Sequence, residues 1–193
     1  YQVSDLNEQR SFSDYQLQRA ATVIVMVVAG LIWCVFKGYT EPMFSICTGS
    51  LLFRAVDGMA DVYEGRLQQK DKLYLAGLSQ ALRCSTSFII FTVILFVTRN
   101  LVWASWGMGI CSLITLVFIS APLAILETDK SARAKISHIK DIFVQCWPLF
   151  LALFLYNLID SLPKFAMEGT LSYSNQLYFN AIYFPAHTIL MIS

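Results

Sequence analysis

Charge is scarce in this chain, and so are the side chains that enzymes use for catalysis. Of its 193 residues, 14% are charged and 56% are hydrophobic, and the net charge is +1 at pH 7. The 2 histidines are His138 and His187, and no GxSxG, HExxH, P-loop or dinucleotide-binding motif occurs. We therefore expect no catalytic residues and no enzymatic activity. Without a basic cluster, we also expect no nucleic-acid partner.

Cysteine pairs at metal-binding or redox spacing are missing too. The five cysteines all lie inside apolar runs, with no CxxC pair and no histidine at metal-ligand spacing: Cys34, Cys47, Cys84, Cys111 and Cys146. We interpret them as small packing residues in apolar surroundings. The sequence therefore predicts no disulfide, no metal site and no cofactor.

Long hydrophobic segments dominate what is present. A transmembrane helix needs about 20 mostly apolar residues to cross about 30 Å of hydrocarbon. Six segments qualify at least in part, at residues 20–36, 43–63, 74–97, 101–126 and 142–162, and from about 178 to the chain end. The sequence therefore predicts an all-α integral membrane protein, a polytopic bundle of about six transmembrane helices with short connections. Because the chain starts at Tyr1 and stops at Ser193 within an apolar run, we expect a piece of a longer protein.

The orientation in the membrane follows from the basic residues, because cytoplasmic loops collect lysine and arginine. One side of the predicted bundle holds nine of them: Arg10, Arg19, Arg66, Lys70, Lys72, Lys130, Arg133, Lys135 and Lys140. The other side holds three, Lys37, Arg99 and Lys164. This asymmetry predicts a cytoplasmic N-terminus. Asp14, three residues after Ser11, is a signal for the start of a helix.

The second apolar segment, 43–63, is interrupted by charges. On a helix, six polar residues fall within an arc of about 80°: Ser50, Arg54, Asp57, Asp61, Glu64 and Gln68. A charge that faces lipid at mid-membrane costs about 2.5 to 3.5 kcal/mol, so this stripe is expected to face the bundle interior or a water-filled cavity. Alternatively, Arg54 pairs with Asp57 or Asp61 only to hold neighbouring helices in register. Because one arginine faces two or three carboxylates, a further basic partner is expected, and Arg83 is the candidate.

Two more segments carry a polar face at helical spacing. One comprises Gln80, Arg83 and Ser87, and the other comprises Asn157, Asp160, Ser161 and Lys164, around the helix-breaking Pro163. The simplest packing directs all three polar faces into one hydrated cavity. The predicted substrate-binding residues are Arg54, Arg83, Lys164, Gln80 and Asn157, and the predicted ion-coupling or cavity residues are Asp57, Asp61 and Asp160. Such a cavity suits a bulky polar solute with anionic groups, because guanidinium groups bind phosphate oxygens bidentately. Proton or sodium coupling is the rival use of the same carboxylates.

Several stretches resemble a known family of transporters. They are YQVSDLNEQRSFSDYQLQR, DGMADVYEGRLQQKDKLYLAGLSQALR, LYNLIDSLPKFAMEG and QLYFNAIYFPAHTILMIS. The most specific parts are DVYEGRLQQ and the pair PKFAMEG and YFNAIYFPA. Together they resemble the flippases for O-antigen, capsule and cell-wall repeat units of the multidrug/oligosaccharidyl-lipid/polysaccharide exporter superfamily, in the form found in Gram-positive bacteria.

The resemblance implies about 12 to 14 transmembrane helices in two pseudo-symmetric lobes around a central cavity. Residues 1–162 would then be part of the N-terminal lobe and the linking helix, and residues 163–193 an outer loop and the start of the next transmembrane helix. Members of the family carry an undecaprenyl-pyrophosphate-linked oligosaccharide from the cytoplasmic to the outer leaflet by alternating access. Arg54 and Arg83, and with them Lys164, would hold the pyrophosphate.

The same resemblance implies the bacterial cytoplasmic membrane as the location. It implies lipid-linked oligosaccharide, membrane lipids and proteins of glycan polymerisation and assembly as partners. An ion-coupled multidrug or cation antiporter of the same superfamily is the nearest alternative, although it would favour an acid-dominated cavity without Arg54 and Arg83. A non-catalytic membrane component of glycan assembly is the other. A membrane glycosyltransferase or polymerase would carry a long catalytic loop, which the short connections disfavour.

Overall fold

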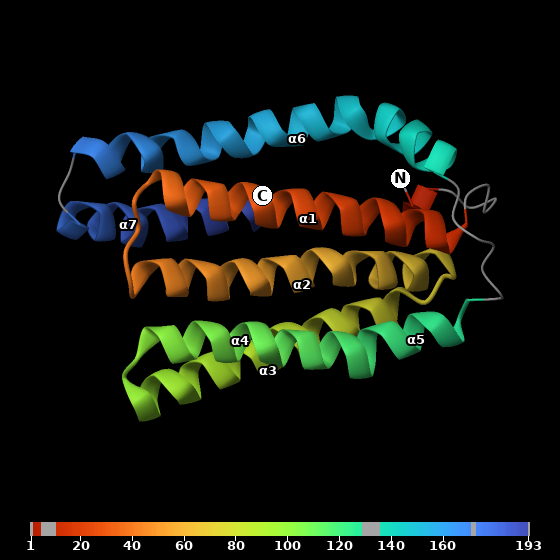
Figure 1. The fold of residues 1–193 in the computed structure, drawn as a ribbon, viewed down its shortest axis with the longest axis horizontal. Coiled ribbons are helices and arrows are strands. Elements are labelled where there is room, and N and C mark those ends of the chain that lie inside the picture. Colours follow the sequence, from red (N-terminus) through yellow and green to blue (C-terminus); the bar gives the residue numbers. More distant parts are fainter. Residues whose placement is uncertain (1, 5–10, 129–135, 171–172, 193) are drawn as a thin grey trace. The chain divides into compact units, whose positions relative to one another are not determined.

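The computed structural model describes residues 2–4, 11–128, 136–170 and 173–192, and these are helical almost throughout (Figure 1). The elements are η1 (Gln2–Ser4), α1 (Phe12–Phe36), α2 (Met43–Gln69), α3 (Leu73–Thr98), α4 (Leu101–Thr115), the π-helical η2 (Leu116–Ser120), α5 (Ala121–Leu126), α6 (Ile136–Thr170) and α7 (Tyr173–Ile192). The chain divides into two compact units, Tyr1–Ile142 and Phe143–Ser193. This boundary lies inside α6. The division after residue 162 that the family resemblance implies stays a prediction.

Four helices in the described part of the chain are long and apolar enough to cross a membrane. They span Phe12–Phe36, Leu73–Thr98, Leu101–Leu126 and Asp141–Ile159, with mean hydropathies of 2.2, 1.9, 2.3 and 1.9. Most of their large apolar side chains are exposed, as expected for surfaces that face lipid. The all-helical membrane architecture agrees with the prediction. The count of about six transmembrane helices is not confirmed, because α2 and α7 are not among the four.

The first helix begins at Phe12, well before the predicted start at residue 20. The hydroxyl of Ser11 accepts from the Asp14 amide at 3.3 Å, and the Asp14 carboxylate accepts from the Ser11 amide at 3.1 Å. This capping box confirms the predicted start signal. The early start places Arg19 two turns inside α1 instead of in a cytoplasmic loop.

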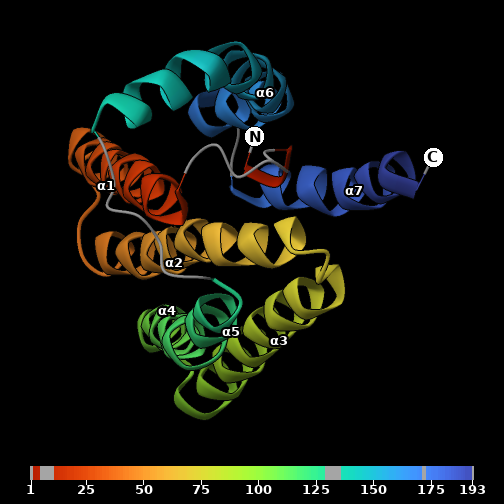
Figure 2. The same ribbon diagram turned by 90° about the vertical axis from the view of Figure 1, so that its right-hand side faces the viewer.

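The charged helix α2 is central to the first unit. It packs against α1 on one side and against α3, α4 and α5 on the other, and it also contacts η1 and η2 (Figures 1 and 2). Residues 37–42 connect it to α1 and residues 70–72 connect it to α3. Such short connections make consecutive helices run antiparallel beside one another, so α2 lies antiparallel to α1 and α3. With 27 residues, α2 is about 40 Å long.

Small residues allow α2 and α4 to approach closely. A Cβ atom added at Gly49 would lie 2.7 Å from Ser105 Oγ and 3.0 Å from both the Ser105 carbonyl carbon and the Trp106 nitrogen. The indole of Trp106 donates to the hydroxyl of Ser45 at 3.1 Å across the same interface. Close approach of helix backbones is the usual basis of helix association in lipid.

Two prolines of the first and second units lie within helices, and one of them was predicted to break its helix. Pro122 follows the π-helical η2 and lies in the first turn of α5, where its missing N–H is accommodated by the altered hydrogen-bond pattern. Pro163 does not end its helix, because α6 continues through it to Thr170. A proline removes a single backbone donor, and a long helix can tolerate that loss.

Candidate functional site

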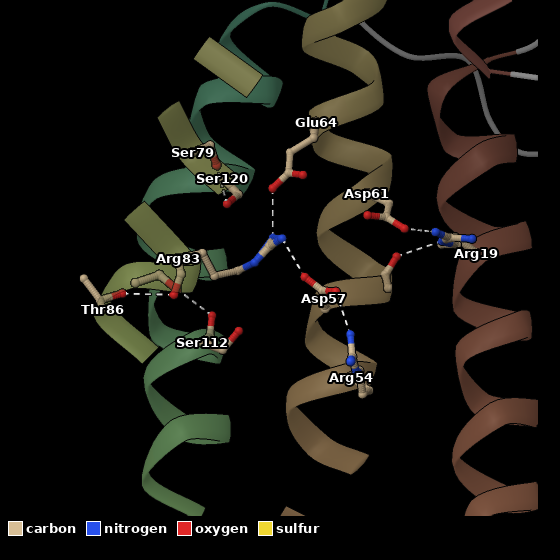
Figure 3. A network of polar contacts seen from close by, with 12 residues as sticks. Arg19, Arg54, Asp57, Asp61, Glu64, Ser79, Arg83, Thr86, Ser112 and Ser120 are labelled. Atoms are coloured by element: carbon tan, nitrogen blue, oxygen red, sulfur yellow. Dashed lines mark hydrogen bonds and ion pairs between the residues drawn. The ribbon is translucent and has the colours of Figure 1, made fainter. Parts of the chain in front are cut away.

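The candidate site is the charged stripe of α2, which comprises Ser50, Arg54, Asp57, Asp61, Glu64 and Gln68. Figure 3 shows that its carboxylates meet arginines from both neighbouring helices, with Arg83 reaching in from α3 and Arg19 from α1. The stripe is thus a network that joins three helices. The sequence predicted the stripe itself and Arg83 as the missing basic partner.

Arg83 bridges two carboxylates of α2. Its Nη1 donates to Glu64 Oε1 at 2.8 Å and its Nη2 donates to Asp57 Oδ1 at 2.8 Å. Asp57 and Glu64 are seven residues apart, which puts them on the same face of α2, about 10 Å apart along the axis. The side chain of Arg83 is fully buried, that of Glu64 is 7% exposed and that of Asp57 is 30% exposed. Arg83 therefore holds α3 against two turns of α2.

Asp61 has a different partner. Nη2 of Arg19 forms an ion pair with Asp61 Oδ2, and Nε of Arg19 donates to the carbonyl oxygen of Gly58 at 2.8 Å. This guanidinium ties α1 to α2. Sequence reasoning missed it because Arg19 immediately precedes the apolar run and was assigned to a loop. The capping box at Ser11 and Asp14 was the signal that could have placed Arg19 inside the helix.

Arg54 is the exposed cation of the stripe. Its Nη1 lies 3.9 Å from Asp57 Oδ2, at the limit of an ion pair, and its side chain is 72% exposed. Arg54 is the twelfth residue of α2, about 16 Å from the start of that helix. It therefore presents a positive charge near the middle of the central helix.

The charges of the network balance overall. Arg19, Arg54 and Arg83 are matched by Asp57, Asp61 and Glu64. The sequence indicated more carboxylates than cations on α2. The structure shows that arginines of the neighbouring helices provide the missing cations. Holding helices in register is therefore what Arg19 and Arg83 do, whereas the sequence had considered that role for Arg54.

The polar face of α3 differs by one residue from the prediction. Arg83 and Ser87 are buried, but Gln80 is exposed and Ser79 takes its place on the buried face. Ser79 Oγ lies 2.7 Å from Ser120 Oγ in η2. Three buried polar atoms in the described residues have no protein partner, namely Arg83 Nε, Ser87 Oγ and Ser112 Oγ. Buried polar groups of this kind usually bind ordered water.

The predicted residues of α6 belong to the second unit. The side-chain amide of Asn157 donates to the Leu153 carbonyl at 2.7 Å within α6, and Nζ of Lys164 lies 4.8 Å from the centre of the Tyr183 ring in α7. The side chain of Asp160 lies outside the described residues. That these residues share one cavity with the stripe of α2 stays a prediction.

Among the described residues, no group of three or more His, Cys, Asp or Glu side chains is placed to hold a metal ion. The five cysteines are free thiols. Comparisons with protein-family models, with curated proteins and with solved structures found no match for this chain. The arguments for function therefore rest on the residues of the chain and on their geometry.

Proposed function

We propose that this chain is part of a membrane transporter that flips undecaprenyl-pyrophosphate-linked oligosaccharide units from the cytoplasmic to the outer leaflet by alternating access. The observation that carries the proposal is Arg54, a 72% exposed guanidinium near the middle of the central helix of an apolar bundle. The resemblance of DVYEGRLQQ, PKFAMEG and YFNAIYFPA to polysaccharide flippases supports the choice of substrate.

The position of Arg54 argues for a polar solute rather than lipid beside it. An arginine that faces hydrocarbon at mid-membrane costs at least about 2.5 kcal/mol, so an exposed one is expected to line a water-filled path. Its weak contact with Asp57 leaves guanidinium donors available, because Asp57 already accepts from Arg83 at 2.8 Å. A pyrophosphate offers the oxygens that such a fork binds.

The same network disfavours a cation antiporter. A site for organic cations needs carboxylates that a bulky solute can reach, whereas Asp61 is paired with Arg19 and Glu64 is 7% exposed and bound by Arg83. In the proposed role, Arg19 and Arg83 keep the helices of the lobe together while Arg54 meets the substrate. The protein would lie in the bacterial cytoplasmic membrane with the N-terminus of this chain in the cytoplasm, beside the proteins that polymerise the glycan.

The proposal is tested in cells that lack the parent gene. We expect cytoplasmic accumulation of lipid-linked oligosaccharide, cured by the wild-type gene and not by a gene that carries Arg54→Ala. Arg54→Lys should restore part of the export, because lysine keeps the charge without the bidentate fork. Lys37→Ala is the matched control, since Lys37 is an exposed cation at the end of α1 and should leave export unchanged.

Normal surface glycan in the deletion strain, together with altered tolerance of drugs or cations, would favour the antiporter instead. Full export by an Arg54→Ala protein would remove Arg54 from the substrate path. Membrane abundance of each variant, measured by immunoblot, separates loss of transport from loss of the protein.

A further inference from the structure

The buried end of the charged stripe holds one cation for two anions. Arg83 donates one N–H group to Asp57 and one to Glu64, each at 2.8 Å. Arg19 is committed to Asp61 and to the Gly58 carbonyl. Arg54 is at 3.9 Å from Asp57 and largely in solvent, so it compensates little of the buried charge. Around Arg83 one negative charge is therefore in surplus, and Glu64, whose side chain is 7% exposed, is the more buried of the two carboxylates.

The other charged groups that the structure describes near this place do not remove the surplus. On α2 itself Asp61 adds negative charge near Glu64, and from α1 the nearest cation is Arg19, which is paired with Asp61. The elements α4, η2 and α5 have no charged residue between positions 101 and 126. From η1, Gln2 contributes a neutral amide, which donates to the Val62 carbonyl at 3.1 Å. An uncompensated carboxylate in such surroundings destabilises the folded protein, and binding a cation relieves that cost.

The smallest cation fits this site best. Both carboxylates already accept from Arg83, and no described group of three or more acidic, Cys or His side chains could hold a metal. Sodium ions prefer a shell of oxygen ligands, and a guanidinium within hydrogen-bond distance repels them. A proton requires one oxygen lone pair.

Buried polar atoms without a protein partner lie next to the site. Nε of the fully buried Arg83 has no protein partner, and neither have the hydroxyls of Ser87 and Ser112. Ser87 is one turn beyond Arg83 on the same face of α3, and Figure 3 shows Ser112 of α4 beside the Arg83 side chain. Unpaired polar atoms buried together are typical positions for bound water, which can deliver and remove protons.

We propose that Glu64, Asp57 and Arg83 form a proton-binding site with Glu64 as the proton acceptor. A proton from water adds to a carboxylate oxygen of Glu64, and Arg83 is then matched one to one by Asp57. Loss of that proton to water restores the bridge from Arg83 to both carboxylates. The site thus has two charge states that differ in how firmly α3 is held to α2. That this proton couples to glycan export rests on the proposed function, whereas proton binding does not.

The test is infrared difference spectroscopy on the purified full-length chain in lipid nanodiscs, between acidic and alkaline buffer and without any glycan. In acidic buffer we expect a band from a protonated carboxylic acid, and this band should be absent in Glu64→Gln. In a parallel titration, Glu64→Gln should bind one proton per chain fewer than the wild type. Asp57→Asn should shift the band to lower pH although Glu64 is intact, because the surplus charge is gone. Glu127→Gln is the matched control, because Glu127 is a partly exposed carboxylate paired with Lys72 outside this network, and this variant should keep the band.

A band that persists in Glu64→Gln would overturn the proposal, and so would a titration that sodium chloride displaces while potassium chloride does not. If Glu64→Gln does not fold, Asp57→Asn decides, since an unshifted band in that variant also overturns the proposal. Because no glycan is present, these outcomes are independent of the export assay. If Arg54→Ala loses export but the wild-type chain shows no band from Glu64, the proton site is refuted and the proposed function is not.

Discussion

Arg83 Nη1 and Glu64 Oε1 lie 2.8 Å apart, in an ion pair whose side chains are 0% and 7% exposed. The two residues are 19 positions apart in the sequence, on consecutive antiparallel helices. The pair fixes both the rotation and the height of α3 relative to α2. A shift of α3 by one turn, about 5.4 Å, would leave the guanidinium without either carboxylate.

Removal of the Arg83 guanidinium should destabilise the first unit. Arg83→Met leaves the buried carboxylate of Glu64 and the partly exposed one of Asp57 without this cation, and we expect a loss of about 3 to 5 kcal/mol in the free energy of unfolding. The measurement is denaturant unfolding of the purified protein in detergent. A triple variant, Arg83→Met with Asp57→Asn and Glu64→Gln, should recover much of the loss. No recovery would mean that Arg83 acts through packing of its aliphatic stem.

The pair Arg19 and Asp61 should respond to a charge exchange. Both side chains are partly exposed, at 37% and 49%, so each single reversal, Arg19→Asp or Asp61→Arg, should cost only about 0.2 to 1 kcal/mol. The double exchange should restore stability, measured by thermal unfolding. Additive losses in the double variant would show that the two side chains do not interact in the folded protein.

Close packing of α2 on α4 predicts opposite effects at two glycines. Gly49→Ala places a Cβ atom within 3.0 Å of the backbone at Ser105 and Trp106, and we expect a cost of about 1 to 3 kcal/mol. Gly77→Ala is the control, because a Cβ there meets nothing within 4 Å and alanine favours a helix by about 0.5 to 1 kcal/mol. Thermal unfolding of both variants checks the prediction. Equal stability of the two would contradict the tight interface.

The predicted orientation can be checked by labelling of single cysteines in intact cells, in a chain whose five native cysteines are replaced by alanine. A cysteine at Ser131 should resist an impermeant thiol reagent, because the basic connection around it is expected in the cytoplasm. A cysteine at Thr40, an exposed residue between α1 and α2, should be labelled. The reverse pattern would invert the topology.

Hydropathy located the apolar helices of the first unit, but the charged helix α2 is not among the four membrane-spanning candidates. The segments predicted at 74–97 and 101–126 agree with α3 and with the run from α4 to α5 within a few residues. By the same measure α2 is not apolar enough to cross a membrane, although it contacts η1, α1, α3, α4, η2 and α5. A window average treats its charges as a cost, whereas their partners on α1 and α3 compensate it.

The candidate site could also be predicted only in part from the sequence. Periodicity predicted the stripe from Ser50 to Gln68, because a helix turns by a fixed angle per residue. It also predicted that Arg83 completes the stripe. It could not tell that Gln80 faces outward while Ser79 is buried, since these neighbours differ by one step of rotation, and only the packing of α4 and η2 on α3 decides which is covered.

The sequence by itself determined that this protein is helical, apolar over most of its length and striped with charge along α2, since composition and helical spacing follow from residue order alone. Only the tertiary structure decided which charge meets which. Arg83 joins Asp57 to Glu64, Arg19 takes Asp61, and Arg54 is left facing outward. These pairings depend on the relative rotation and height of three helices, which are set by side-chain packing between residues distant in the sequence.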